Sequence, residues 1–160
     1  MEDYIAYLRQ QIGHARCLSV GLSALIVNPK GEILLEKRRD NGLFCLPGGS
    51  IDYEEKVVDG LKREIWEETG VSLQKASLFM VQSGERTTLH YPNGDVTNYV
   101  VLTFYCPLEG ATNPIKPHDQ ESLEVFFCPP ERLPKEEEFL PDDVIVLRKY
   151  LKRDFTVQVD

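Results

Sequence analysis

The chain has 160 residues, of which 42% are hydrophobic and 28% are charged, and its formal net charge at pH 7 is -8. This length and composition fit one globular domain over residues 1–160, large enough to bury about two thirds of the surface that its unfolded chain exposes. The negative charge excludes a broad basic surface for a nucleic-acid polymer and leaves room for local basic pockets that bind a small anion.

An amphipathic helix opens the chain. Apolar residues recur at helical spacing from Tyr4 to Ile12, and Gly13 then supplies a stop, so we predict a helix within residues 1–13. This helix either caps the core or contributes to the interface of a homodimer, and the first role is the simpler one.

A β-hairpin follows the helix. Residues 19–27 are apolar and rich in β-forming side chains, residues 28–31 carry the turn sequence Asn-Pro-Lys-Gly, and residues 32–36 resume the apolar pattern. Residues 44–49 then form a short strand that runs into a glycine-rich loop. The hairpin therefore leads into a strand and a loop.

The second half of the chain alternates helix and strand signals. Residues 56–69 have the pattern of a helix that ends at Gly70, in the position where helices favour a left-handed residue. Two strands are predicted at residues 76–83 and 98–105, with strong turn chemistry at residues 91–95 between them. This arrangement predicts a β-meander.

The last predicted elements are a strand and a closing helix. Residues 123–127 form the strand, Pro129 and Pro130 break it, and apolar spacing over residues 142–151 predicts the helix.

The cysteines and the N-terminus indicate a reducing compartment. The four cysteines are far apart and form neither a Cys-x-x-Cys pair nor a zinc-ligand cluster, so we expect them to be reduced and mostly buried: Cys17, Cys45, Cys106 and Cys128. The first residues are acidic where a signal peptide is basic, and no apolar run approaches the roughly 20 residues that span a bilayer. These features predict a cytoplasmic location and no membrane partner.

Three carboxylates occupy one face of the predicted helix at 56–69. Glu64, Glu67 and Glu68 stand at positions i, i+3 and i+4, where side chains are neighbours and like charges repel. A hard divalent cation such as magnesium is a suitable counter-ion, since it takes oxygen ligands and is often shared with substrate phosphates. Such a metal lowers the pKa of a bound water, which attacks phosphorus while another carboxylate accepts its proton.

The loop before the helix supports this interpretation. Gly48 and Gly49 permit a tight turn whose backbone can approach an ion or a phosphate closely. The simpler alternative is a solvated acidic face on which Arg63 and Glu67 form an i,i+4 ion pair worth a few tenths of a kcal/mol. The clustered like charges, the adjacent Pro-Gly-Gly sequence and the flanking strand favour the metal site.

The segment at residues 49–71, which we call the box segment, resembles the Nudix box. That pattern is Gly, five residues, Glu, seven residues, Arg-Glu, an aliphatic residue, any residue, Glu-Glu, any residue, Gly and an aliphatic residue. Every specified position is filled, by Gly49, Glu55, Arg63, Glu64, Ile65, Glu67, Glu68, Gly70 and Val71. The similarity outside this segment is looser and extends over most of the chain.

The resemblance implies roles for the box residues. Glu67 and Glu68 are implied as the principal metal ligands, and Glu64 as a ligand or the proton acceptor. The Gly49 carbonyl is implied as a further ligand, with Mg²⁺ or Mn²⁺ as the metal. Three other residues are implied as structural support for the loop and helix: Glu55, Arg63 and Gly70.

Residues outside the box segment are weaker candidates. Family members often add a carboxylate from a later loop, and Glu121 is the best positional match for this catalytic role; Asp119 and Glu124 are close rivals, and an ordinary loop carboxylate is the alternative. Arg38 and Arg39 are candidates for binding substrate phosphates, although basic residues at a strand end are more often solvated.

The resemblance also implies a fold of the α/β class, a Nudix-type α/β/α sandwich around a mixed β-sheet. One position in the predicted helix is unusual, because Gly60 costs about 1 kcal/mol relative to alanine in a helix interior. Close packing of the helix is a plausible reason for this glycine.

The implied activity is hydrolysis of a phosphoanhydride bond in a small nucleotide, namely a nucleoside diphosphate linked to another moiety. ADP-ribose or a nucleotide sugar is one candidate, but the proline that ADP-ribose pyrophosphatases of the family often carry beyond the box is absent from residues 84–88. A (d)NTP pyrophosphohydrolase and a dinucleoside-polyphosphate hydrolase stay open, as does a non-catalytic nucleotide sensor. Tyr91, Tyr99 and Phe104 either stack on a base or belong to the core and the sheet surface.

Overall fold

The computed structural model describes residues 4–110 and 120–160, and one mixed β-sheet organises these residues. The helices and short 3-10 turns are α1 (Tyr4–Ile12), α2 (Val57–Thr69), η1 (Glu85–Thr87), η2 (Pro130–Arg132), η3 (Glu136–Glu138) and α3 (Pro141–Leu151). The strands are β1 (Cys17–Val27), β2 (Ile33–Arg38), β3 (Phe44–Cys45), β4 (Gly48–Ser50), β5 (Ser77–Gln82), β6 (Thr88–His90), β7 (Val96–Pro107), β8 (Ser122–Cys128) and β9 (Gln158–Val159).

The sheet runs in the order β3-β2-β1-β7-β5-β9, with β4 paired to β1, β6 to β7 and β8 to β2. Its centre is the parallel pair of β1 and β7, which stays in register from Cys17 beside Thr97 to Val27 beside Pro107. β5 and β9 are also parallel, and the other pairs are antiparallel. The sheet is therefore mixed, as predicted.

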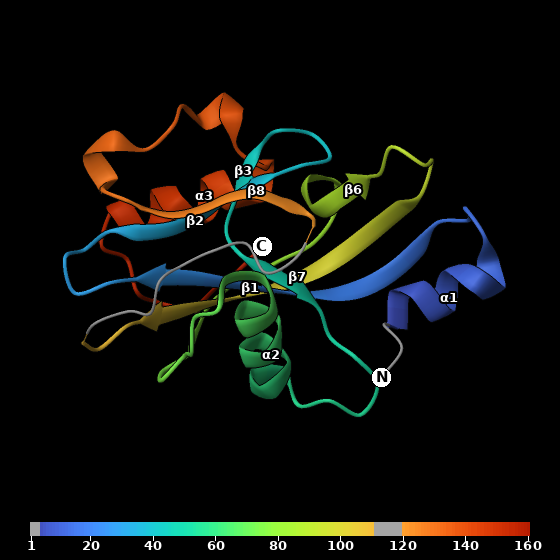
Figure 1. Ribbon diagram of the computed structural model, residues 1–160, viewed down its shortest axis with the longest axis horizontal. Coiled ribbons are helices and arrows are strands. Elements are labelled where there is room, and N and C mark those ends of the chain that lie inside the picture. Colours follow the sequence, from blue (N-terminus) through green and yellow to red (C-terminus); the bar gives the residue numbers. More distant parts are fainter. Residues whose placement is uncertain (1–3, 111–119) are drawn as a thin grey trace.

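Helices cover both faces of this sheet (Figure 1). β1 divides its side chains between two buried clusters, because successive residues of a strand point to opposite faces. One cluster combines alternate residues of β1 with α2, and contains Leu22, Ala24, Ile26, Leu61 and Ile65. The other combines the remaining residues with α3, and contains Leu25, Val27, Val146, Leu147 and Tyr150. The predicted α/β/α sandwich is confirmed.

Most predicted elements are present close to the expected residues. The hairpin of β1 and β2, strand β8 and the closing helix α3 are confirmed. Helix α2 ends at Gly70, whose φ of 72° is left-handed and whose N–H donates to the Trp66 carbonyl oxygen at 2.9 Å. The cysteines are free, and all except the partly buried Cys17 are buried.

The predicted β-meander is present only in part. β5 and β7 are antiparallel neighbours, but β5 and β6 lie end to end along one edge of β7, because β1 occupies the whole of its other edge. None of the described residues of α1 is buried, and Ile5, Leu8 and Ile12 are half-buried, so the role of this helix stays a prediction.

None of the helices in residues 4–110 and 120–160 has the length and apolar character that crossing a bilayer requires.

Candidate active site

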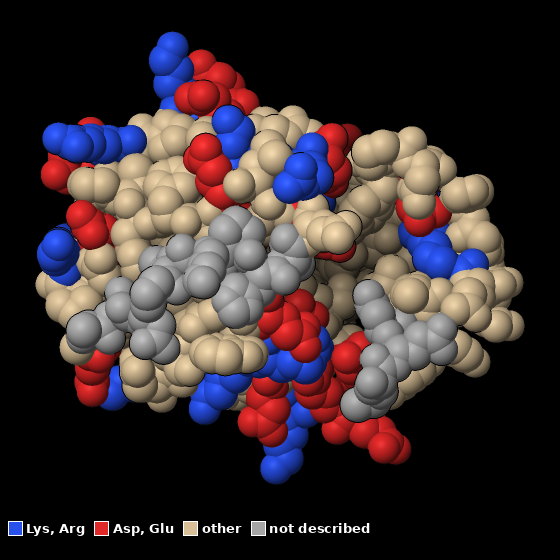
Figure 2. Space-filling model, viewed as in Figure 1, with Lys and Arg blue, Asp and Glu red and all other residues tan. Residues whose placement is uncertain are grey.

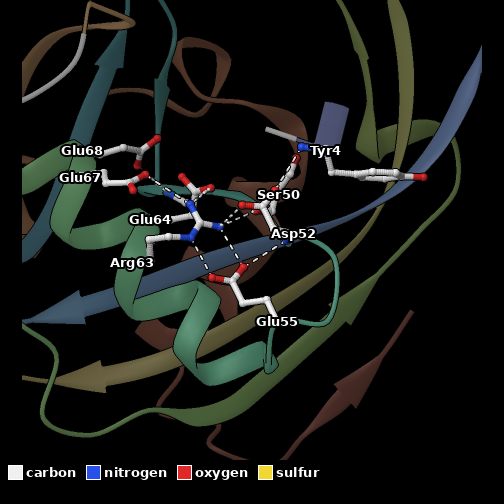
Figure 3. Close-up of polar contacts among 9 residues, drawn as sticks. Tyr4, Ser50, Asp52, Glu55, Arg63, Glu64, Glu67 and Glu68 are labelled. Atoms are coloured by element: carbon white, nitrogen blue, oxygen red, sulfur yellow. Dashed lines mark hydrogen bonds and ion pairs between the residues drawn. The ribbon is translucent and has the colours of Figure 1, made fainter. Parts of the chain in front are cut away.

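Arg63 is the centre of the polar contacts in the box segment (Figure 3). Its guanidinium donates to both carboxylate oxygens of Glu55, at 2.7 and 2.9 Å, and to the Ser50 carbonyl oxygen at 3.2 Å. It also donates to Glu64 at 2.9 Å and to Glu67 at 3.2 Å. Hydrogen bonds to Glu55, and then to Glu64, raise the pKa of Arg63, and the same contact lowers the pKa of Glu55. Arg63 thus ties the loop before α2 to the helix itself.

Gly60 makes room for this arrangement. A Cβ at position 60 would lie 2.6 Å from Oε2 of Glu55 and 3.1 Å from a methyl carbon of Leu22. The same Glu55 oxygen accepts a hydrogen bond from the Asp52 N–H at 3.1 Å, in addition to the one from Arg63. The glycine that is unfavourable for the helix therefore lets Glu55 approach α2, which confirms the close packing expected there.

Gly48 and Gly49 are not in a turn, and that prediction is wrong. Both belong to β4, which pairs with β1. Glycine is required here for close approach: a Cβ on Gly48 would lie 2.0 Å from the backbone oxygen of Leu22, and a Cβ on Gly49 would lie 2.2 Å from the carboxylate of Glu64. The strand thus passes directly beside the candidate catalytic carboxylate.

The three candidate carboxylates of α2 lie in one cleft with different surroundings. Glu68 is buried, and its Oε2 accepts a hydrogen bond from the Gly48 N–H at 2.9 Å. The side chain of Glu64 is 17% exposed and that of Glu67 is 56% exposed, and both contact Arg63. Their helical spacing thus produces one acidic wall.

The cleft has a volume of about 640 Å³, within the range of small-molecule sites. Figure 2 shows it as a hollow right of centre, with acidic side chains gathered beside it. Besides the acidic wall, it is lined by Arg38 and Glu121 among the residues predicted from the sequence outside the box segment. Tyr91 and Tyr99 also line it, whereas Phe104 is buried in the core.

Arg38 and Arg39, at the end of β2, differ in their position relative to the cleft. Arg38 lines the cleft and donates to both carboxylate oxygens of Asp40, at 2.9 and 2.7 Å. Arg39 is exposed, is not among the residues that line the cleft, and donates to the Gln120 carbonyl oxygen at 2.7 Å. The structure therefore brings Arg38 to the site and not Arg39.

The candidate carboxylates that follow the box segment also differ in their position relative to the cleft. Glu121 lines the cleft at the start of β8, and its carbonyl oxygen accepts a hydrogen bond from the Arg39 N–H at 2.8 Å. Glu124 pairs with Lys37 in the sheet and is not among the residues that line the cleft. Asp119 lies outside the described residues.

Two aspartates at the start of α3 were not predicted as site residues. Asp142 and Asp143 both line the cleft, and Asp143 accepts a hydrogen bond from the Leu46 N–H at 2.9 Å. Burial raises the pKa of both carboxyl groups. In the sequence, an Asp-Asp pair after a proline is equally typical of a helix start, so no local signal distinguished them.

Among residues 4–110 and 120–160, no three acidic, histidine or cysteine side chains are arranged so that they could hold a metal ion together. Within the acidic wall, the guanidinium of Arg63 donates hydrogen bonds to Glu64 and Glu67. The donor chemistry nevertheless suits a hard cation, since carboxylate oxygens and a strand backbone face one cleft.

A family model described as the NUDIX domain matches residues 18–150, which include the whole box segment. The chain belongs to the Nudix family. The resemblance of residues 49–71 to the Nudix box is therefore a family relationship, and the cleft beside α2 is the candidate active site of this Nudix domain.

Individual relatives agree with this assignment. The MutT-like protein of Streptomyces ambofaciens is 30% identical over 115 residues, covering 72% of this chain and 66% of that protein. Phosphatase NudJ of Escherichia coli K12 is 29% identical over 100 residues, covering 61% of this chain and 60% of that protein. The chain thus spans less than two thirds of the length of these two Nudix relatives.

Solved structures show the same fold. The MutT NUDIX hydrolase from Burkholderia pseudomallei superimposes with a TM-score of 0.64 at 28% identity, covering 82% of this chain and 96% of that one. The NUDIX domain of Shewanella oneidensis NrtR, complexed with ADP ribose, gives a TM-score of 0.67 at 16% identity, covering 94% and 98%. At that identity, the second likeness concerns the Nudix fold alone.

Proposed function

We propose that this Nudix domain is a divalent-metal-dependent hydrolase that cleaves a phosphoanhydride bond in a nucleoside diphosphate linked to another moiety. The observation that carries the proposal is the acidic wall of Glu64, Glu67 and Glu68, which faces a substrate-sized cleft directly beside the backbone of Gly49. The names of the NudJ phosphatase and of the MutT NUDIX hydrolase from Burkholderia pseudomallei support a hydrolytic activity.

Magnesium or manganese would be held by Glu67 and Glu68, with Glu64 and the Gly49 carbonyl as further donors. When bound, the metal supplies charge neutralisation for the diphosphate and a water of lowered pKa. The residues of the chain then perform two tasks. Arg63 and Glu55 keep β4 and α2 together, and Glu64 or Glu121 accepts the proton of the attacking water.

Arg38 is the candidate for binding substrate phosphate. It lines the cleft, and its guanidinium can bind two phosphate oxygens at once when it leaves Asp40. Because Asp40 is exposed, it can be solvated after that exchange. Arg39 has no such access, and we assign it no role in binding.

A (d)NTP pyrophosphohydrolase is the second candidate, favoured by the MutT-like relative. A non-catalytic sensor is disfavoured, because all three carboxylates of the acidic wall are present and line the cleft. The ADP ribose in the neighbouring NrtR structure identifies one ligand to test.

The test is a panel of nucleoside-diphosphate sugars, ADP-ribose, dinucleotides and (d)NTPs, assayed with magnesium or manganese and with chelator. We expect metal-dependent release of a nucleoside monophosphate from one class. Replacing Glu67 or Glu68 by glutamine should lower kcat by about 10²- to 10⁴-fold. Asp59→Asn is the matched control, since it removes a carboxylate from the same helix outside the cleft. Normal turnover in both glutamine variants would exclude the assigned metal site.

A further inference from the structure

Glu36 and Ser122 form a buried polar pair outside the box segment. Glu36, on β2, is 4% exposed, and Ser122, at the start of β8, is 2% exposed. The Ser122 hydroxyl donates a hydrogen bond to Oε1 of Glu36 at 2.6 Å. Short hydrogen bonds from a hydroxyl to a carboxylate are stronger than those between neutral groups, so this pair joins the two strands firmly.

This pair lies beside the two cleft residues that the sequence predicted outside the box segment. Glu121, the residue before Ser122, lines the cleft. Arg38 follows Glu36 by two positions on β2, and both of them line the cleft. Residues two apart on a strand point to the same face, so Glu36 and Arg38 share one face of β2.

A change of register between β2 and β8 produces the contact. Lys37 lies beside Glu124, and in an unbroken antiparallel ladder the next pair would be Arg38 with Leu123. Instead, Arg38 lies beside Ser122, so Leu123 is the one extra residue of a β-bulge and is 44% exposed. The bulge thus places a serine where a leucine would otherwise face the cleft side of the sheet.

The backbone that precedes Ser122 is also bonded to β2. The Arg39 N–H donates to the Glu121 carbonyl oxygen at 2.8 Å, and the Arg39 side chain donates to the Gln120 carbonyl oxygen at 2.7 Å. Arg39, Gln120 and Glu121 are all exposed, so water can compete for these two bonds. The buried bond between Ser122 and Glu36 is protected from that competition.

A hydrogen-bonded pair is a costly way to join two strands. Burying a carboxylate is unfavourable, and a well-packed apolar pair would join β2 and β8 without that cost. A hydrogen bond, however, has a preferred length and angle, whereas apolar contacts are not directional. The bond between Ser122 and Glu36 therefore fixes where β8 begins, and with it the place of the adjacent Glu121.

We propose that Ser122 and Glu36 are positioning residues that hold Glu121 in the cleft. Ser122 acts through the backbone that it shares with Glu121, and Glu36 acts through the Ser122 hydroxyl. The inference rests on the proposed hydrolase function, in which Glu121 is one of the two candidate proton acceptors. It adds two residues to the site, neither of which belongs to the box segment.

The first test measures amide hydrogen exchange of the Arg39 N–H, which reports the place of Glu121 without turnover. Ser122→Ala should accelerate this exchange about 10-fold, because the bond that it removes is to a charged group. The Arg38 N–H is the internal reference, since it donates to the Leu43 carbonyl oxygen at 2.9 Å, and its exchange should change less than about twofold. Equal acceleration of the two amides would indicate a general loss of stability and would overturn the proposal, as would unchanged exchange of both.

Variants of the acceptor make this test specific for the hydrogen bond. Glu36→Leu removes the acceptor and should accelerate Arg39 exchange as much as Ser122→Ala does. Glu36→Gln keeps an oxygen that can accept from the hydroxyl, so the acceleration should be less than about threefold. Ser19→Ala is the matched control, because Ser19 is a buried serine of β1 that does not line the cleft, and it should leave the exchange unchanged.

The second test is a kinetic double-mutant cycle with the substrate class that the wild-type chain hydrolyses. Ser122→Ala should lower kcat about 10-fold, but less than about twofold in a Glu121→Gln background, because residues that act as a unit are not additive. Equal losses in the two backgrounds would contradict positioning through Glu121. Ser19→Ala should leave kcat within about twofold of the wild-type value.

The two tests separate the positioning role from the proposed function. If Glu121→Gln itself leaves kcat unchanged, Glu121 is not the proton acceptor, and Ser122→Ala should then leave kcat unchanged as well. If the chain hydrolyses no member of the substrate panel, the hydrolase function fails. In both cases, the exchange of the Arg39 N–H still decides whether the pair holds Glu121 in place.

Discussion

Gly48→Ala should lower the stability of the protein, whereas Gly49→Ala should lower its activity, although the two positions are adjacent. The added Cβ of Gly48→Ala meets the backbone oxygen of Leu22 at 2.0 Å, so the β1–β4 pairing itself has to move. The added Cβ of Gly49→Ala meets the end of the Glu64 side chain at 2.2 Å, which can rotate away. One substitution therefore strains the sheet, and the other displaces a candidate catalytic group.

The expected sizes follow from what must move. Overpacking of a well-packed site lowers the free energy of unfolding by about 1–3 kcal/mol. Because Gly48→Ala displaces backbone, we expect a loss near the upper end of this range, about 3 kcal/mol. For a domain of this size that corresponds to a fall in Tm of roughly 6–12 °C. Gly49→Ala should cost less than about 1 kcal/mol of stability, but should lower kcat by about 10²-fold or more because Glu64 leaves its place.

Urea unfolding and steady-state hydrolysis, measured on both variants, distinguish these outcomes. The assay uses the substrate class found active for the wild-type chain, at saturating metal, so that a loss of kcat is not a loss of metal. Equal destabilisation by the two alanines, or unchanged kcat in Gly49→Ala, would refute the assignment of Gly49 to the Glu64 contact.

Two further predictions concern side chains elsewhere in the cleft. Burial raises the pKa of Asp143, so the folded state holds this proton more tightly than the unfolded state and loses stability as pH rises through the folded pKa. Asp143→Asn keeps an oxygen for the Leu46 N–H, and should flatten the pH dependence of urea unfolding above about pH 4, where the unfolded carboxyl group loses its proton, without lowering stability at pH 7. Arg38→Ala should raise KM about 10-fold through the loss of a charge-assisted bond, whereas Arg39→Ala should leave KM within about twofold; equal effects would contradict the assignment of Arg38 alone to the cleft.

Local signals were sufficient for the helices. Helix α2 was predicted because its apolar spacing and the terminal Gly70 are properties of neighbouring residues, and the left-handed cap is present. The parallel pairing of β1 and β7 joins residues about 80 positions apart, as in Cys17 beside Thr97. No local pattern determines such a register, so the sequence predicted the hairpin of β1 and β2 without predicting that β1 and β7 are neighbours.

The same distinction explains the site. Glu64, Glu67 and Glu68 were recognised as a group because helical spacing alone places them together. The sequence predicted a turn at Gly49, because glycine is common in turns. Glycine is required there because the backbone passes close to the side chain of Glu64, 15 positions later. Asp143 was missed because its place in the cleft depends on the packing of α3 against Leu46.

The sequence predicted a metal because the three acidic side chains of α2 repel one another. In the structure, this repulsion is a weaker argument for a metal. Arg63 already bonds to Glu64 and Glu67, and Glu68 accepts the Gly48 N–H, so the chain itself offsets part of the repulsion. The case for a metal also rests on oxygen donors that face a substrate-sized cleft. A cation that takes the oxygens of Glu64 and Glu67 bonded to Arg63 must compete with one nitrogen of that guanidinium. The other guanidinium contacts, to Glu55 and to the β4 backbone, are independent of that exchange, so the loop can stay in place while the acidic wall rearranges.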